Sequence, residues 1–257
     1  MNTSPPLQNE LRFWPELARL LTAPVFWGPT RGSGRRAERR PVLLIPGFMA
    51  GDASLTVLAG WLRRRGHRVR TSGIRLNVGC SGRDLRRLDA VLEAFGEPVV
   101  LIGQSRGGTL ARALAARRPD AVAALVTLGS PVLDPLAVSP HVLRTVRSVA
   151  FLGDHGVRWL FSTECRDGEC CSEFWALLRQ PLPPGARALA VYSRSDAIVD
   201  WRACLDPDAE WLEIDGSHCG MAVNAAVYRE LERLLGGVDE PPRADDPPRT
   251  EEASWSR

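Results

Sequence analysis

The chain of 257 residues contains no lysine, because all 33 of its basic residues are arginine. A phosphate-binding loop of the Gly-Lys-Ser/Thr type requires a lysine, so this class of nucleotide-binding protein is excluded. The arginines exceed the acidic residues only slightly, which leaves a formal net charge of +3, and they are spread along the chain. We therefore expect no nucleic-acid partner.

Long hydrophobic runs are also missing. No apolar stretch reaches the roughly 18 residues that a membrane-spanning helix needs, so the sequence predicts no transmembrane segment. The first residues, MNTSPPLQNELRFWPELARLL, lack the basic start and the continuous apolar region of a secretory signal. The expected location is therefore the cytoplasm.

Cysteines are few, six in all, and three of them lie in the segment CRDGECC, at Cys165, Cys170 and Cys171. Without an export signal we expect reduced thiols; a bond from Cys165 to Cys170 or Cys171 would need an oxidising compartment. A zinc site would need a fourth ligand at matching spacing, and none is evident in the sequence. No metal site is predicted.

Residues 1–40 are expected to form an N-terminal arm. Apolar residues recur there at intervals of three and four, which predicts a helix with one apolar face that docks on the body of the protein: Leu7, Leu11, Trp14, Leu17 and Leu21. The segment GPTRGSGRRAERR, ending at Arg40, is then a flexible basic linker. At the other end, residues 237–257 are proline-rich and charged, which predicts a disordered tail.

Residues 41–236 alternate between apolar runs of strand length and amphipathic helical segments. Because the apolar runs are continuous, they are typical of a parallel sheet covered on both faces. The sequence predicts an α/β domain with a mostly parallel twisted sheet of about six strands and helices on both faces. The expected strands lie in PVLLIPG, HRVRTSGI, PVVLIG, AVAALVTLGSP, ARALAVYS and AEWLEIDG.

Residues 131–186 separate two of these strands, which is far longer than the usual connection of about 2–6 residues. This segment is therefore expected to be an insertion that forms a cap or lid. It is rich in aromatic residues, including Trp159 and Phe161. Such residues either pack internally or line a pocket beneath the lid.

The segment IGQSRGG, residues 102–108, joins a predicted strand to a predicted helix. Its glycine spacing does not fit the dinucleotide-binding pattern Gly-x-Gly-x-x-Gly. Gly103 to Gly107 fits the pattern Gly-x-Ser-x-Gly, the nucleophile elbow, in which a strained turn exposes a serine hydroxyl at the top of the sheet. Ser105 is thus a candidate nucleophile, and a purely structural turn serine is the alternative.

Histidines are scarce, and the chain has only four. A serine hydroxyl needs an adjacent base to become a strong nucleophile. In the fold that carries this elbow, an acid and then a histidine follow the serine along the chain. Only His218 comes after the last predicted strand, since His67 precedes Ser105 and the others, His141 and His155, lie in the insertion.

The acid is expected in the loop after ARALAVYS, which offers Asp196 and Asp200. Asp196 is favoured because it lies closer to the strand end, where a carboxylate can reach the imidazole. Asp200 is expected to cap a short helix that begins near Trp201.

Backbone N–H groups are expected to stabilise the oxyanion that forms during acyl transfer. One is the N–H of Arg106, and the other comes from the loop IPGFMAGDAS, from Phe48 or alternatively Met49. Together with Trp159 and Phe161 of the insertion, Phe48 and Met49 are the expected substrate-binding residues.

These segments together resemble the α/β-hydrolase superfamily over residues 41–236, in the lipase/esterase branch related to small bacterial triacylglycerol lipases. In such lipases a Ser-x-x-Asp-x-Ile-Val segment carries the catalytic aspartate, which matches residues 193–199 and supports Asp196. The sequence departs from the family in two places, with Pro46 where a histidine is usual and Gln104 where a histidine is commoner. The resemblance rests on LLIPGFMAGDASL, LIGQSRGG, VTLGSPV, VYSRSDAIVDW and IDGSHCGM.

The resemblance implies a serine hydrolase that cleaves carboxylic esters through an acyl-enzyme on Ser105, with Asp196 and His218 completing the triad. It implies no cofactor, and a small ester with an apolar acyl group as substrate. The same triad can serve acyltransferases, thioesterases and amidases. A non-catalytic binding protein with the hydrolase fold is the alternative from a different class.

Overall fold

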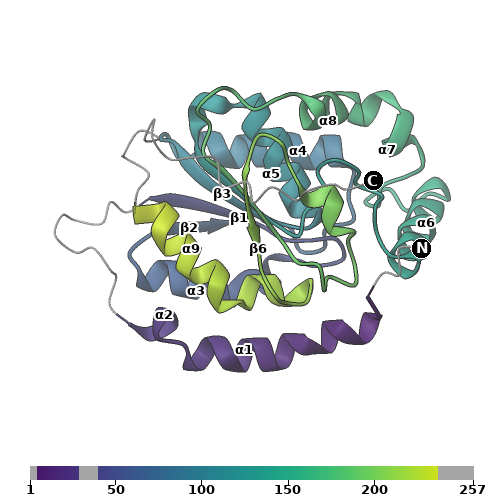
Figure 1. Cartoon of the computed structure of the whole chain (residues 1–257). Coiled ribbons are helices and arrows are strands. Elements are labelled where there is room, and N and C mark those ends of the chain that lie inside the picture. The colour runs from purple at the N-terminus through teal and green to yellow at the C-terminus, as the bar shows by residue number, and fades with distance from the viewer. Residues whose placement is uncertain (1–4, 29–39, 237–257) are drawn as a thin grey trace, which may run out of the picture.

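A computed structural model describes residues 5–28 and 40–236, so the expected basic linker and C-terminal tail lie outside the described residues, apart from Gly28 and Arg40. The described strands form one sheet in the order β2-β1-β3-β4-β5-β6, and every neighbouring pair is parallel (Figure 1). The predicted α/β class and six-stranded parallel sheet are confirmed. The strands are β1 (Pro41–Ile45), β2 (Arg68–Thr71), β3 (Val99–Gln104), β4 (Val122–Leu128), β5 (Ala188–Tyr192) and β6 (Glu210–Glu213).

Helices cover both faces of this sheet (Figure 1). One face carries α4 (Ser81–Glu93), α5 (Arg106–Arg117) and α8 (Glu169–Arg179). The other face carries α1 (Phe13–Thr22), α2 (Pro24–Trp27), α3 (Thr56–Arg64) and α9 (Ala225–Gly236). The sheet is therefore buried on both sides, which is why its strands are continuous apolar runs.

Alternation along β1 shows how the two cores are built. Val42 and Leu44 pack with the helices of one face, whereas Leu43 and Ile45 pack with those of the other, and all four are fully buried. Successive strand residues point to opposite faces of a sheet. Each such side chain stabilises the fold by about 1.5–3 kcal/mol relative to an exposed one.

The connections reverse direction at the centre of the sheet. The chain passes from β1 outward to β2, then returns to place β3 on the other side of β1. In open α/β sheets such a switch point leaves a crevice at the carboxyl ends of the strands, where ligands bind. The loops after β1 and β3, which contain Phe48 and Ser105, both begin at this edge.

The insertion between β4 and β5 contains α6 (Pro140–Asp154), α7 (Glu164–Asp167) and α8. Phe174 and Leu178 of α8 are buried in the same core cluster as α4 and α5, so this helix belongs to the layer that covers the sheet. The exposed aromatic residues Phe151 and Trp159 lie in the earlier part of the insertion. The cap or lid therefore stays a prediction for the stretch from α6 to α7.

The N-terminal arm docks on the body, but not through the expected face. Its predicted apolar stripe is largely solvent-exposed, and Leu11 and Trp14 retain 70% and 69% of their surface. The docked side contains Glu16 and Leu20, with Phe13 and, from the predicted stripe, Leu17 partly buried beside them. The segment is not one continuous α-helix, because a 3₁₀ helix, η1 (Leu7–Arg12), precedes α1. A 3₁₀ helix has three residues per turn, so its apolar positions fall out of phase with those of α1.

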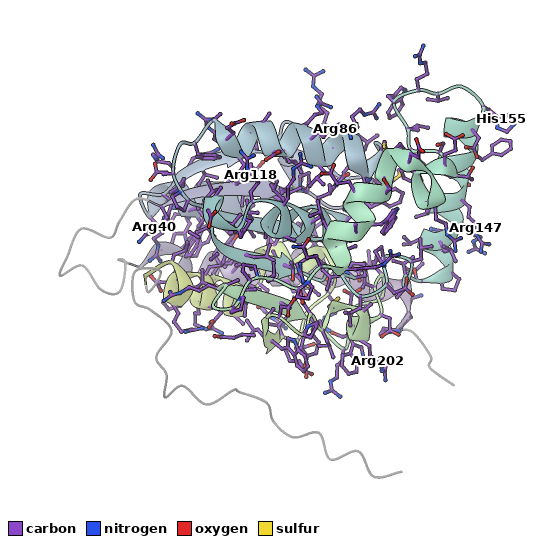
Figure 2. The ribbon with its side chains drawn as sticks, turned by 90° about the horizontal axis from the view of Figure 1, so that it is seen from above. Arg40, Arg86, Arg118, Arg147, His155 and Arg202 are labelled. Atoms are coloured by element: carbon purple, nitrogen blue, oxygen red, sulfur yellow. The ribbon has the colours of Figure 1, made fainter. Side chains whose placement is uncertain are left out.

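Charged side chains are distributed around the molecule. Figure 2 shows Arg86, Arg147 and Arg202 on different sides of the molecule, and His155 pointing outward beside α6. Among the described helices, none combines the length and the apolar character needed to cross a bilayer.

Candidate active site

Ser105 stands in a strained turn between β3 and α5. Its backbone has φ 52° and ψ −123°, in the region that L-residues rarely adopt, and such a residue typically costs about 1–3 kcal/mol. Its N–H donates to the carbonyl of Leu128 at the end of β4, 2.8 Å away. A Cβ on Gly107 would overlap the carbonyl oxygen of Ile45, so the elbow tolerates only glycine there. The strain is therefore maintained by close packing of the strand ends.

A buried carboxylate and imidazole face the same edge of the sheet. One oxygen of Asp196 lies 2.6 Å from Nδ1 of His218, and both side chains are almost fully buried. The other Asp196 oxygen accepts the N–H groups of Ile198 and Val199, each at 2.8 Å. Because the carboxylate accepts the bond, the proton resides on Nδ1, and Nε2 is left with a free lone pair.

The second aspartate of this loop has a different position. Asp200 is exposed and accepts the N–H of Arg202 at 3.1 Å, which caps the 3₁₀ helix η4 (Trp201–Cys204). Of the two candidates, only Asp196 contacts the imidazole in the described part of the chain. This geometry favours Asp196 as the acid.

Ser105 and His218 both contact residues at the end of β4. A Cβ on Gly129 would lie 3.0 Å from Nδ1 of His218, and the preceding residue, Leu128, accepts the Ser105 N–H. The side-chain amide of Gln104 donates to the His218 carbonyl at 3.1 Å, so the residue before Ser105 also holds the loop that contains His218. Within residues 5–28 and 40–236 the Ser105 hydroxyl forms no hydrogen bond with the imidazole. A bond of this kind often forms only in the substrate complex.

The loop after β1 lies directly against the elbow. A Cβ on Gly47 would be 3.2 Å from the Cβ of Ser105. Met49 has a positive φ of 58°, and its N–H donates to the carbonyl of Asn77 at 3.3 Å. The N–H groups of Phe48 and Arg106 donate to no other described residue, so both are free to bind an oxyanion. The geometry thus favours Phe48 over Met49 as the donor from this loop.

The insertion contributes an aromatic ring above this loop. The rings of Phe48 and Phe161 lie 6.1 Å apart between centroids, and the Arg106 guanidinium lies 5.7 Å from the Phe161 centroid. Trp159 is 57% exposed, and its carbonyl accepts a hydrogen bond from Arg83 at 3.0 Å. Of the expected substrate-binding residues, Phe48 and Phe161 are therefore brought together, whereas Met49 and Trp159 are exposed.

Two glutamates of the N-terminal arm hold the loops that carry Asp196 and His218. Glu10 accepts the N–H groups of Ala197, His218 and Cys219 at 3.3, 3.2 and 2.9 Å. Glu16 is buried and accepts both the N–H and the hydroxyl of Ser217, at 2.8 and 2.7 Å. No local motif links these glutamates to loops about 200 positions later, so their role could not be predicted from the sequence.

Opposing effects set the pKa of His218. Burial lowers this pKa, since it disfavours the charged imidazolium, but the charge and hydrogen bond of Asp196, with the charge of Glu10, outweigh burial and raise the pKa above its ordinary value. A general base must be neutral to accept a proton. We therefore expect activity to fall as pH decreases through the raised pKa.

Replacing Glu10 by glutamine should shift the acidic limb of the kcat/KM profile to lower pH. The amide oxygen can still accept the N–H groups of Ala197 and His218, whereas the bond from the Cys219 N–H is lost, and the negative charge that raises the pKa of His218 is removed. Rates measured across pH for wild type, Glu10→Gln and the exposed control Glu93→Gln give the comparison. An acidic limb that stays in place in Glu10→Gln would show that this charge does not act on the base.

The cysteine segment has a partner that the sequence did not reveal. The sulfur atoms of Cys165, Cys170 and Cys171 lie with that of Cys80 within 4.8 Å of one another. The premise that no fourth ligand exists is therefore wrong. Cys80 precedes α4, some 85 positions earlier in the chain, so no short spacing pattern could identify it.

The parallel sheet, the strained turn at Ser105 after β3 and the Asp196–His218 contact after β5 and β6 are typical of the α/β-hydrolase fold. A family model described as the alpha/beta hydrolase fold matches residues 64–158. The chain is 32% identical to triacylglycerol lipases of Pseudarthrobacter phenanthrenivorans and Burkholderia plantarii, over 47% of this chain and 44% and 40% of theirs. It thus spans less than half the length of these curated relatives.

Solved structures share the fold. The mature form of the Bacillus licheniformis lipase BlEst2 superposes with a TM-score of 0.56 at 15% identity, over 83% of this chain and 99% of that one. The chain accordingly has the α/β-hydrolase fold, and the relatives named here are lipases.

Proposed function

We propose that this protein is a carboxylic ester hydrolase that works through an acyl-enzyme on Ser105. The observation that carries the proposal is the buried 2.6 Å contact between Asp196 and His218 at the edge of the sheet where the serine elbow stands. The sequence similarity to triacylglycerol lipases supports ester hydrolysis as the reaction class.

The first half of the proposed reaction forms the acyl-enzyme. The Ser105 hydroxyl attacks the ester carbonyl while Nε2 of His218 accepts its proton, and Asp196 stabilises the resulting imidazolium. The N–H groups of Phe48 and Arg106 stabilise the oxyanion of the tetrahedral intermediate. As this intermediate collapses, the bond to the alcohol breaks and His218 donates the proton to the departing oxygen.

The second half releases the acid. Water attacks the acyl-enzyme carbonyl while His218 again accepts a proton, and the same two N–H groups stabilise the second oxyanion. The acyl–Ser105 bond then breaks, the proton returns to the serine oxygen, and the free enzyme is restored. Every step uses side chains and backbone groups of this chain, so the proposal needs no cofactor.

The acyl group is proposed to be apolar. Phe48 and Phe161 place two aromatic rings beside the proposed oxyanion donors, and Met49 and Trp159 add exposed apolar surface on the same loop and on the insertion. Apolar walls with few polar groups are typical of sites for small ligands. The proposed substrate is thus a small ester with an apolar acyl chain.

Two measurements on the wild-type protein test the proposal. Hydrolysis of p-nitrophenyl esters with acyl chains of increasing length should be detectable and should improve with chain length. A fluorophosphonate should stop the reaction and leave its phosphonyl adduct on the peptide that contains Ser105, as seen by mass spectrometry. Turnover without an adduct at Ser105, or no turnover of any ester in the series, would contradict the proposal.

A further inference from the structure

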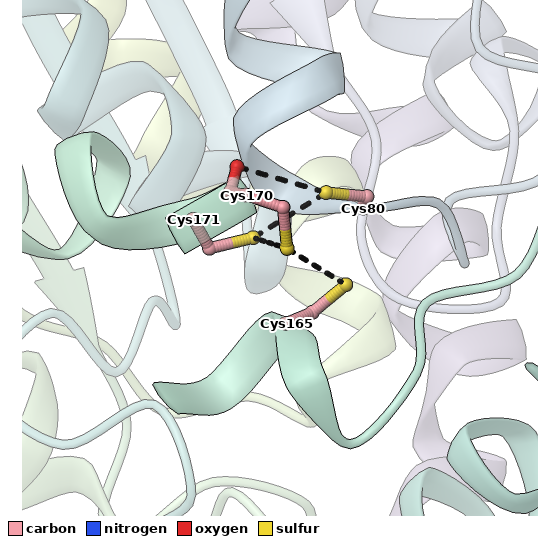
Figure 3. A group of neighbouring side chains, drawn as sticks. All are labelled: Cys80, Cys165, Cys170 and Cys171. Atoms are coloured by element: carbon pink, nitrogen blue, oxygen red, sulfur yellow. Dashed lines mark hydrogen bonds between the residues drawn. The ribbon is translucent and has the colours of Figure 1, made fainter. Parts of the chain in front are cut away.

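The four clustered cysteines come from three separate segments of the chain (Figure 3). Cys80 ends the loop before α4, Cys165 lies in α7, and Cys170 and Cys171 lie in the first turn of α8. The sulfur of Cys171 is 3.4 Å from that of Cys80 and 3.8 Å from that of Cys170. The sulfur of Cys165 is 3.7 Å from that of Cys170.

These separations match the edges of a thiolate tetrahedron around zinc. With Zn–S bonds of about 2.3 Å, the sulfur atoms of a tetrahedral site lie roughly 3.8 Å apart. We propose that Cys80, Cys165, Cys170 and Cys171 bind one Zn²⁺ ion in a structural site. Four cysteine ligands complete the coordination of zinc, so the ion would have no open position for a substrate.

The surroundings suit a site of negative charge. Four thiolates and one Zn²⁺ carry a net charge of −2, and the N-terminal ends of α4 and α8 both meet the sulfur cluster, where helix dipoles favour anions. The N–H of Gly82, in the first turn of α4, donates to the sulfur of Cys171 at 3.4 Å. A Cβ on Gly82 would overlap the carbonyl of Cys170, so the two helix ends are packed in direct contact.

The site would join the insertion to the loop that supports the elbow. Arg106, the residue after Ser105, donates to the Gly79 carbonyl and the Ser81 hydroxyl at 2.6 and 2.9 Å, on either side of Cys80. Phe161 donates its N–H to the Val78 carbonyl at 2.8 Å. Zinc would therefore hold the part of the insertion around Phe161 and the loop that Arg106 contacts in one fixed arrangement. The zinc ion would take no part in the reaction proposed for Ser105.

Metal analysis of the full-length wild-type protein, purified without chelator, tests the proposal directly. Elemental analysis should find about one zinc per chain, and native mass spectrometry should show the matching mass increase. Exchange with Co²⁺ should produce the intense visible absorption of tetrahedral cobalt thiolate, which other coordination geometries lack. Removal of the metal by a chelator should lower Tm, because a bound metal stabilises the folded state.

Two variants separate this site from the other cysteines. Cys80→Ser should lose the zinc, whereas Cys204→Ala, at a buried cysteine outside the cluster, should retain it. If Cys80→Ser fails to fold, thiol titration of denatured wild type distinguishes bound zinc from disulfides. If the cluster holds zinc, all six thiols of the wild type should react without reductant once a chelator is added. Two disulfides within the cluster would leave only Cys204 and Cys219 reactive, and that result, or six free thiols without metal, would overturn the proposal.

Discussion

Replacing Ser105 by alanine should lower kcat for ester hydrolysis by roughly 10⁴–10⁶-fold, the range expected when the nucleophile of a serine triad is removed. The variant retains the Cβ and the packing of the elbow, but it has no oxygen that can form the acyl-enzyme. The residual rate would come from the oxyanion donors and from substrate binding alone. Because side-chain volume hardly changes, Tm should remain close to that of wild type.

The comparison uses purified Ser105→Ala and the control Ser148→Ala, which replaces an exposed serine on α6 whose hydroxyl donates to the Arg144 carbonyl. The control should hydrolyse p-nitrophenyl esters like wild type, and only Ser105→Ala should lose labelling by the fluorophosphonate. Equal turnover by wild type and Ser105→Ala would refute the assignment of the nucleophile.

The sheet and the elbow could be predicted because each depends on local sequence. Continuous apolar runs such as PVLLI and VVLIG form β1 and β3, since strands buried on both faces need apolar residues at every position. Gly107 and the strand–helix junction around Ser105 identified the elbow, because close approach of the strand ends admits only a small residue there. These features depend on neighbours within a few positions of the chain.

The N-terminal arm could not be predicted in the same way. Apolar periodicity indicated a docked stripe, of which Leu17 packs against the core, but α1 docks mainly through Leu20 and the carboxylate of Glu16, and the rest of the stripe faces solvent. A buried glutamate is tolerated because it accepts two hydrogen bonds from Ser217. A periodicity count includes apolar residues only, so a polar docking face escapes it.

Other parts of the site depend on contacts between distant parts of the chain. Glu10 contacts the His218 loop, and Cys80 contacts the CRDGECC segment, only in the folded arrangement. Residues 78–82 lie beside α7 and α8 because α4 and α8 share the core on one face of the sheet. Neither pair has a fixed sequence separation that a motif search could use. Tertiary packing, not spacing, creates both arrangements.

Replacing Asp196 by asparagine should lower kcat by about 10³–10⁴-fold, close to the loss expected when a triad carboxylate becomes an amide. The asparagine oxygen can still accept the N–H groups of Ile198 and Val199, so its NH₂ group would face Nδ1 of His218. That NH₂ group donates to Nδ1, which places the imidazole proton on Nε2. The nitrogen that faces the substrate would then lack the lone pair that a general base needs.

The matched control for this variant is Asp200→Asn, four positions along the same loop. Asp200 is exposed and caps η4, and asparagine caps a helix about as well as aspartate does, so the replacement should leave kcat within about threefold of wild type and Tm nearly unchanged. Steady-state rates on one p-nitrophenyl ester, with Tm for all three proteins, make the comparison. Loss of activity in Asp200→Asn, together with wild-type turnover in Asp196→Asn, would transfer the role of the acid to Asp200. Loss in Asp196→Asn alone, at unchanged Tm, would establish that the buried contact with His218 orients the base.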